Sequence, residues 1–258
     1  MTNKKVENSN FMKYMGSKRR IAKYILPLIL KDRKPNQWYV EPFVGGANMI
    51  DKVKGNRIGN DINRYLIALY LELQKGWNPP LDIITYDLYK DVKENKDKYP
   101  DYMVAYVGFA FTFGATFFGG FVGNVNDKCC KGRDRLGESY RNIIKTQKSI
   151  TDITFTSTEY SKLQIPANSL IYCDPPYENT SKYKVDAFDH NLFWKWCKCK
   201  SKEGHTVFIS EYNAPDDFKC IWSKQIANVL DKKGNNKKPT EKLFTLANTL
   251  TDTKQWFF

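Results

Sequence analysis

Residues 38–61 read WYVEPFVGGANMIDKVKGNRIGND, and this stretch decides the fold class. The apolar run from Trp38 to Val40 is typical of a short buried strand, and a turn with two glycines follows it directly. We expect a helix to start near Ala47 and a second strand, residues 57–61, to end on an acid. Strand, turn, helix and strand in this order form the opening of a doubly wound α/β sheet.

The strand pattern returns in the second half of the chain, in three apolar runs. They are Ile153 to Phe155, Leu170 to Cys173 and Thr206 to Ile209. Residues 77–149 lack this pattern and combine a charged stretch, a glycine- and phenylalanine-rich stretch and a basic one. The sequence therefore predicts a Rossmann-like sheet domain of residues 11–76 and 150–248, with a mainly helical lobe inserted at 77–149 and tails at 1–10 and 249–258.

The charge balance favours a polyanionic partner. The 258 residues hold 41 Lys and Arg against 28 Asp and Glu, a net charge of +13, and nucleic acid is the commonest partner of so basic a chain. A lysine-rich proteome would produce the same surplus, so charge alone decides nothing. The polar N-terminus and the lack of a long apolar run lead us to expect a soluble cytoplasmic protein. The six cysteines lack zinc-site spacing, and we expect neither a metal nor an obligatory protein partner.

The tetrapeptide Asp174-Pro175-Pro176-Tyr177 follows an apolar strand directly. Ligands of open α/β sheets bind beyond the carboxyl ends of the strands, which is where this turn falls. A rigid turn without a functional role is the plain alternative. The chemistry favours a site, because a carboxylate and a fixed carbonyl could accept both hydrogens of an amino group and stabilise the positive charge of its alkylated nitrogen. The aromatic ring offers a face for a base swung out of a duplex.

Two further motifs contain the residue types of a ligand site. Gly45 and Gly46 let a backbone approach a ligand closely, and Asp61 can hold ribose hydroxyls. The pattern is not the dinucleotide fingerprint, which favours a ligand without a pyrophosphate; a plain turn is the alternative. The run KYMGSK at 13–18 is either a helix start with a solvated basic face or a tight turn that places Tyr14 and Lys18 over a small ligand.

With KYMGSK, EPFVGG, NDI and DPPY in this order, the chain resembles the Dam-like D12 class of N6-adenine DNA methyltransferases. Further matches are FDH at 188–190, FISEY at 208–212 and EKLF at 241–244, so the resemblance spans most of the chain. It implies a Rossmann-like methyltransferase sheet, S-adenosylmethionine as cofactor, double-stranded DNA as partner, and methyl transfer to the N6 nitrogen of a flipped adenine. The compact form is similar to phage-encoded and mobile-element members, which implies a bacterial cytoplasm or a phage-infected cell.

The resemblance also implies a role for each matching residue. The cofactor-binding set consists of Tyr14, Lys18, Phe43, Gly45, Gly46, Asp61 and Asp174, with Lys18 at the cofactor's carboxylate and Asp61 on its ribose. The catalytic set consists of Asp174, Pro175 and Tyr177, with Asp174 as the acceptor for the amino group. Ser210 and Glu211 fit a structural role better, and His190 fits a helix N-terminus.

The lobe departs from the family pattern. Members that recognise GATC have a lobe pattern similar to F-N-G-x-x-R-x-N followed by G-x-F-N-x-P. In this chain the corresponding residues, 109–120, are FAFTFGATFFGG. We therefore expect a short, degenerate target motif rather than GATC. The residues expected to contact DNA are Lys128, Lys131, Arg133, Arg135 and Arg141, with the lysines of a polar loop at 231–240, and each fits a solvated surface charge equally well.

Two alternatives stay open at the level of sequence. An enzyme of the same fold that methylates RNA adenine would need the same extruded base and basic surface. A non-catalytic DNA-binding protein on a methylase scaffold would keep the fold, although its catalytic tetrapeptide or its ribose acid would be expected to decay first. Both motifs are complete in this chain.

Overall fold

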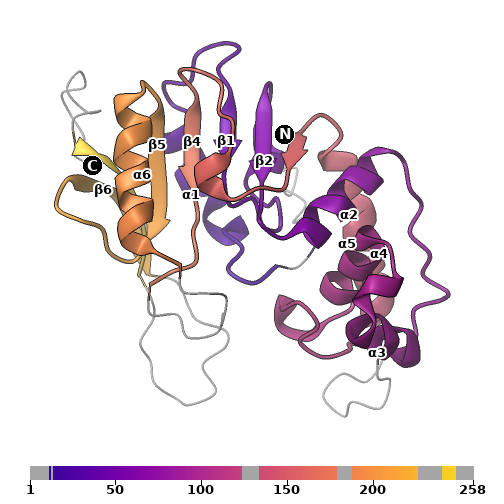
Figure 1. Ribbon diagram of the computed structural model, residues 1–258. Helices are drawn as coiled ribbons and strands as arrows, with labels where there is room; N and C mark the ends of the chain where they lie inside the picture. Colours follow the sequence, from indigo (N-terminus) through magenta and orange to yellow (C-terminus); the bar gives the residue numbers. More distant parts are fainter. Residues whose placement is uncertain (1–11, 13, 124–133, 179–187, 226–239, 248–258) are drawn as a thin grey trace, which may run out of the picture.

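The computed structural model describes residues 12, 14–123, 134–178, 188–225 and 240–247. Its centre is a seven-stranded sheet in the order β3-β2-β1-β4-β5-β7-β6 (Figure 1). The strands are β1 (Tyr39–Glu41), β2 (Arg57–Asn60), β3 (Thr154–Thr156), β4 (Leu170–Cys173), β5 (Thr206–Glu211), β6 (Phe218–Gln225) and β7 (Thr240–Leu246). The first five run parallel, and β7 runs antiparallel between β5 and β6. The predicted Rossmann-like doubly wound sheet is confirmed, with its topological switch point between β1 and β4.

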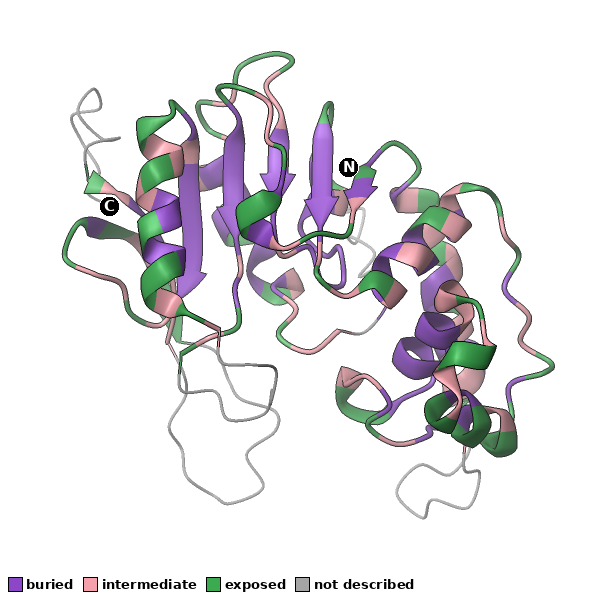
Figure 2. Ribbon diagram, viewed as in Figure 1, coloured by how far each residue is buried: buried purple, intermediate pink, exposed green. Residues whose placement is uncertain are grey.

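Both faces of the sheet are covered, which parallel strands require. Tyr39 and Tyr172 pack on one face in a core shared with α1 (Arg19–Ile29), and Val40 and Ile171, their chain neighbours, pack on the other with α6 (His190–Lys202). Figure 2 shows the central strands buried along their length. α6 begins at His190 as predicted, capped by the Asp189 side chain, which accepts a hydrogen bond from the Leu192 amide.

The remaining helices gather beside the β3 end of the sheet (Figure 1). They are α2 (Arg64–Gln74), α3 (Tyr86–Glu94), α4 (Asp101–Ala105), the π-helix η3 (Tyr106–Ala110) and α5 (Arg135–Ser149), with 3₁₀ turns at η2 (Lys96–Lys98) and η4 (Phe113–Ala115). The insertion is thus mainly helical where it is described, as predicted. Its buried side chains, such as Val104 and Ile143, belong to the same core as α1, so the lobe packs continuously with one face of the sheet. The domain boundaries themselves stay a prediction.

The helix expected near Ala47 is wrong. Gly45 and Ala47 have φ angles of 44° and 53°, in the left-handed region, and only the 3₁₀ turn η1 (Ile50–Lys52) follows. A right-handed helix cannot run through such residues. The amides of the loop bond across to the next strand end instead: Val44 donates to the carbonyl of Asn60 at 2.7 Å, and Gly45 donates to Asp61 at 3.0 Å.

Candidate active site

Four carboxylates meet at one edge of the sheet. Glu41, Asp174 and Glu211 stand at the carboxyl ends of the parallel strands β1, β4 and β5, which share that edge. Glu241 joins them from β7, which runs the other way and therefore begins where the parallel strands end. The edge includes the switch point, where open α/β sheets bind their ligands.

Lys18 is the cation that two of these carboxylates share. Its Nζ lies 3.2 Å from Oδ1 of Asp174 and 3.2 Å from Oε2 of Glu241, and the side chain is only 7% exposed. The Tyr177 hydroxyl donates to the same Glu241 oxygen at 2.7 Å, and Lys18 Nζ lies 4.1 Å from the centroid of the Tyr177 ring. The KYMGSK and DPPY motifs are therefore joined directly, with Glu241 as a partner to which the sequence had given no role.

Burial dominates the electrostatics of this edge. It raises the pKa of Asp174 to about 6, with the charge of Lys18 opposing the rise and that of Glu241 adding to it. Burial alone would lower the pKa of Lys18, but the charges of Asp174 and Glu241 outweigh it and leave that pKa above its ordinary value. Asp174 is thus mainly ionised at neutral pH, held by an ammonium that stays charged.

Glu211 and Glu41 are buried beside this pair. Burial raises the pKa of Glu211 to about 7, although its carboxylate accepts hydrogen bonds from the amides of Tyr212, at 2.7 Å, and Glu178, at 3.4 Å. Burial also raises the pKa of Glu41 well above its ordinary range, with the Tyr39 hydroxyl donating to it at 2.8 Å. The bonds of Glu211 fix the end of the DPPY turn, which supports the structural role that the sequence favoured.

The glycine turn lies under Tyr14. A Cβ added to Gly45 would come 2.8 Å from the Tyr14 ring, and one added to Gly46 would come 2.5 Å from Tyr14 Cβ, so these positions require glycine. Asp61 ties the turn down, because its two oxygens accept the amides of Gly45 at 3.0 Å and Asn63 at 2.9 Å. Each oxygen keeps a further lone pair, so the carboxylate can still accept from a ligand hydroxyl.

Asn48 ends this turn with an unsatisfied amide. Its side chain is 5% exposed, and among the residues that the structure describes neither its nitrogen nor its oxygen has a hydrogen-bond partner. A buried polar group left unpaired costs about 1–3 kcal/mol, so its presence calls for an explanation. Its Nδ2 lies 2.5 Å from the position that a Cβ would take on Gly46. A ligand that brought a donor and an acceptor to this amide would satisfy it.

Phe43 belongs to an aromatic cluster on the α6 side of the same edge. Its ring centroid lies 5.2 Å from that of Tyr160, in η6 (Tyr160–Lys162), and 5.8 Å from that of Phe188. Phe43 and Phe188 are half-buried, so the cluster has an accessible side. Neither Tyr160 nor Phe188 was predicted to contact a ligand. No motif includes Tyr160, and the FDH match that includes Phe188 was given no ligand role.

The predicted DNA contacts are described only in part. Arg135 and Arg141 are both on α5. The Arg135 guanidinium lies 4.9 Å from the centroid of the Phe113 ring, and Arg141 forms an ion pair with Asp134 at 3.2 Å. Lys128, Lys131 and Arg133, and the loop at 231–240 except Thr240, lie outside the described residues. The phenylalanine-rich stretch of the lobe contacts the KYMGSK loop, because the Met15 amide donates to the carbonyl of Ala115 at 3.1 Å.

No three side chains of His, Cys, Asp or Glu among the described residues are grouped as metal ligands would be. No helix in the same part of the chain combines the length and apolar character needed to cross a bilayer.

Residues 14–114 match the sequence model of a protein family, the D12 class N6 adenine-specific DNA methyltransferases. The predicted resemblance to the D12 class is confirmed. The match covers residues 14–18 of the KYMGSK run, the glycine turn and Asp61 but stops before Asp174, so the candidate role of the DPPY turn rests on its own geometry. The modification methylase StsI of Streptococcus sanguinis is 26% identical over 188 residues, or 64% of this chain. The chain spans only 28% of the length of that relative.

A solved structure was also found to be similar. It is that of SMU.472, assigned as a methyltransferase and crystallised with SAH; the TM-score is 0.39 at 12% identity, over 93% of this chain and 55% of that one.

Proposed function

We propose that this chain transfers a methyl group from S-adenosylmethionine to the N6 nitrogen of adenine in double-stranded DNA. The observation that carries the proposal is the Asp174 carboxylate, placed on the turn after β4 and held by Lys18 beside the ring of Tyr177. An ionised acceptor beside an aromatic face, at the switch point of the sheet, suits an amino group on a flat base.

The residues at the glycine turn fit the cofactor. Asp61 has lone pairs for ribose hydroxyls, and the unpaired donor and acceptor of Asn48 match the carboxylate and ammonium of an amino acid. Phe43 offers a ring beside the same edge. When bound, the cofactor supplies an electrophilic methyl group on a positively charged sulfur, and the carboxylate surplus at this edge favours a cation. Lys18 forms an ion pair with the Asp174 carboxylate, and the predicted contact of Lys18 with the cofactor stays a proposal.

Asp174 acts on the amino group of adenine. Its carboxylate accepts one N–H, and the carbonyl of Pro175 is proposed to accept the other, which favours a pyramidal nitrogen with an available lone pair. The bound cofactor would supply the methyl group, and the alkylated nitrogen would carry a positive charge that the Asp174 carboxylate stabilises until the nitrogen releases its proton to solvent. Lys18 keeps Asp174 ionised and fixed, so little reorganisation is needed. The ring of Tyr177 packs against the base.

Transfer of tritiated methyl groups to purified DNA tests the proposal. We expect label in N6-methyladenine from duplex DNA, identified after digestion, and much less from total RNA. Preferential labelling of RNA would establish the RNA alternative instead. Binding of S-adenosylmethionine without a labelled product on either nucleic acid would show a non-catalytic protein on this scaffold.

Asp61→Ala should weaken cofactor binding more than it slows the saturated enzyme. A ribose hydroxyl left without its partner costs roughly 1–3 kcal/mol, and the Gly45 amide loses its acceptor too. Calorimetry with S-adenosylmethionine measures the loss, and Asp61→Asn, which keeps an acceptor oxygen of the same size, should lose less. An Asp61→Ala protein with unchanged affinity would argue against the ribose contact.

Charge reversal on α5 should weaken DNA binding in a salt-dependent way. If Arg135 and Arg141 contact phosphates, Arg135→Glu and Arg141→Glu should each lower the slope of log affinity against log salt by about 0.9. Lys202→Glu is the matched control. Lys202 is exposed at the end of α6, close to the start of β5, and so lies at the edge of the sheet opposite the candidate active site. Slopes equal to that of the control would remove this face of the lobe from the DNA interface.

A further inference from the structure

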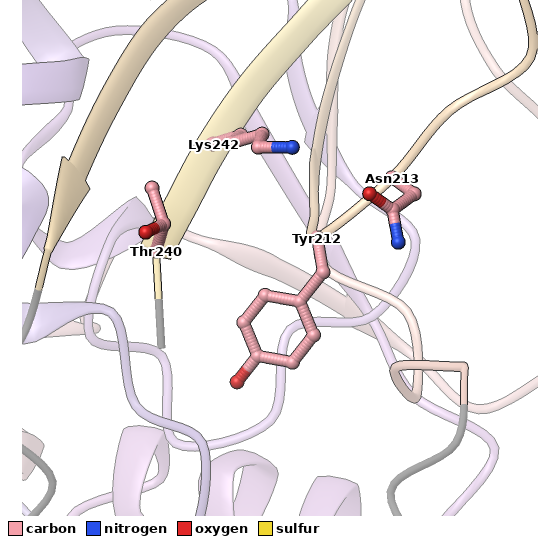
Figure 3. Close-up of a pocket in the computed structure, with 4 residues that line it drawn as sticks. All are labelled: Tyr212, Asn213, Thr240 and Lys242. Atoms are coloured by element: carbon pink, nitrogen blue, oxygen red, sulfur yellow. The ribbon is translucent and has the colours of Figure 1, made fainter. Parts of the chain in front are cut away.

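A hollow of about 250 Å³ lies beside the candidate catalytic turn. It is lined by Tyr212 and Asn213, just after β5, and by Thr240 and Lys242 at the start of β7 (Figure 3). The Tyr212 ring packs edge-on against Tyr177, with 4.6 Å between the ring centroids and 84° between the planes. The hollow therefore adjoins the place where the target base is proposed to sit, but none of its residues has a role there.

Strand alternation separates Lys242 from the Lys18 cluster. Successive residues of β7 point to opposite faces of the sheet: Leu243 packs in the core on the α1 side and Phe244 in the core on the α6 side. Glu241 shares its side with Leu243 and reaches Lys18, whereas Lys242 shares its side with Phe244. Lys242 lies opposite Glu211 of β5 in the strand register. The Glu211 carboxylate accepts hydrogen bonds from the amides of Tyr212 and Glu178. Within the described residues Lys242 forms no ion pair, so its charge is available to an anion.

The lining has the chemistry of a nucleotide site. Tyr212 supplies a ring for stacking, Asn213 an amide for a base edge, Thr240 a hydroxyl, and Lys242 a cation for a phosphate. The hollow is smaller than the roughly 300–1,000 Å³ of pockets that enclose drug-sized ligands, so it would hold part of a polymer rather than a whole cofactor. It also lies on the β5–β7 half of the sheet, whereas the glycine turn and Asp61 lie on the β1–β2 half.

We propose that this hollow binds the nucleotide next to the target adenine on the same DNA strand, with Lys242 on the phosphate that joins the two. The inference rests on the proposed function and adds a subsite to it. Because Tyr212 contacts both the hollow and Tyr177, a nucleotide held there would fix the backbone from which the target base is swung out.

Duplexes that carry one neutral methylphosphonate in place of a phosphate test this contact. The phosphates flanking the target adenine are replaced one at a time, and DNA affinity is measured for the wild type, Lys242→Gln and Lys219→Gln. Lys219 is the control because it is an exposed lysine on β6, which pairs with β7, and because it lies opposite Thr245, farther from the site edge than the half-buried Lys242. Both substitutions remove one positive charge.

At one flanking position we expect the neutral linkage to weaken DNA binding roughly tenfold for the wild type and for Lys219→Gln. A tenfold loss is the low end of what a hydrogen bond to a charged group contributes. Lys242→Gln should bind the unmodified duplex that much more weakly and be insensitive to that linkage. Its salt slope should also fall by about 0.9. Equal sensitivity of all three proteins at every position would overturn the proposal.

Three further outcomes separate the subsite from the proposed function. If Lys242→Gln loses affinity for S-adenosylmethionine without DNA, the hollow belongs to the cofactor and the subsite is wrong. If the wild type labels no adenine in DNA, the proposed function fails. If the wild type methylates DNA while Lys242→Gln matches Lys219→Gln, only the subsite fails.

Discussion

Asp174→Ala should lose methyl transfer by about 10² to 10³ while its affinity for S-adenosylmethionine changes by no more than about tenfold. The reason is that the carboxylate acts mainly on the amino group in the transition state, where a preorganised partner contributes most. The fold should survive, because Lys18 keeps Glu241 as a second partner at 3.2 Å. Single-turnover transfer of a tritiated methyl group measures the rate, and calorimetry measures cofactor affinity.

Asp174→Asn is the matched variant. It keeps the size of the side chain and one acceptor oxygen but loses the charge and places a donor opposite the amino hydrogens, so we expect nearly the same loss of rate. Turnover close to that of the wild type in either variant, with normal cofactor affinity, would remove Asp174 from catalysis.

The strand ends were predictable because parallel strands place their carboxyl ends at one edge whatever the details of packing. That rule located Asp61 and Asp174 from short apolar runs alone. It also explains why Gly45 and Asp61, sixteen residues apart, bond to each other. Local pattern and topology agree at these positions, so sequence was a sufficient guide.

Glu241 could not be found in the same way. It lies at this edge because β7 runs antiparallel between β5 and β6. No local sequence pattern predicts that strand direction. The sequence showed only the run EKLF, without a role for its acid. Tyr212 and Lys242 reach the hollow through the same β5–β7 pairing, so their neighbourhood also depends on register rather than on motif.

The loop at Ala47 shows the opposite failure. The strand, turn, helix and strand order of a doubly wound sheet favoured a helix after the glycines. The bonds from Val44 and Gly45 to the end of β2 hold the backbone in a tight turn and bring Ala47 to a positive φ. Tertiary hydrogen bonds thus override local preference at this turn.

Lys18→Met should move the acid limb of the pH–rate profile to higher pH. In the wild type burial raises the pKa of Asp174 to about 6, and Lys18 opposes that rise, so activity that needs ionised Asp174 should fall as the pH drops through about 6. Without Lys18, Asp174 faces Glu241 with no cation between them, and its pKa rises further. The ionised fraction below the new pKa is then smaller, and we expect a loss of about 10² near pH 6 that recovers as the pH increases.

Stability must be measured alongside, because removing one partner of a buried ion pair costs about 3–5 kcal/mol. Thermal unfolding of Lys18→Met sets a temperature at which the protein stays folded across the pH range, and the profile is recorded there. Lys18→Arg keeps a cation between the two carboxylates and should leave the limb near pH 6 even if its rate is lower. A purely structural Lys18 would lower activity equally at every pH, so a folded Lys18→Met enzyme with an unshifted limb would contradict the assignment.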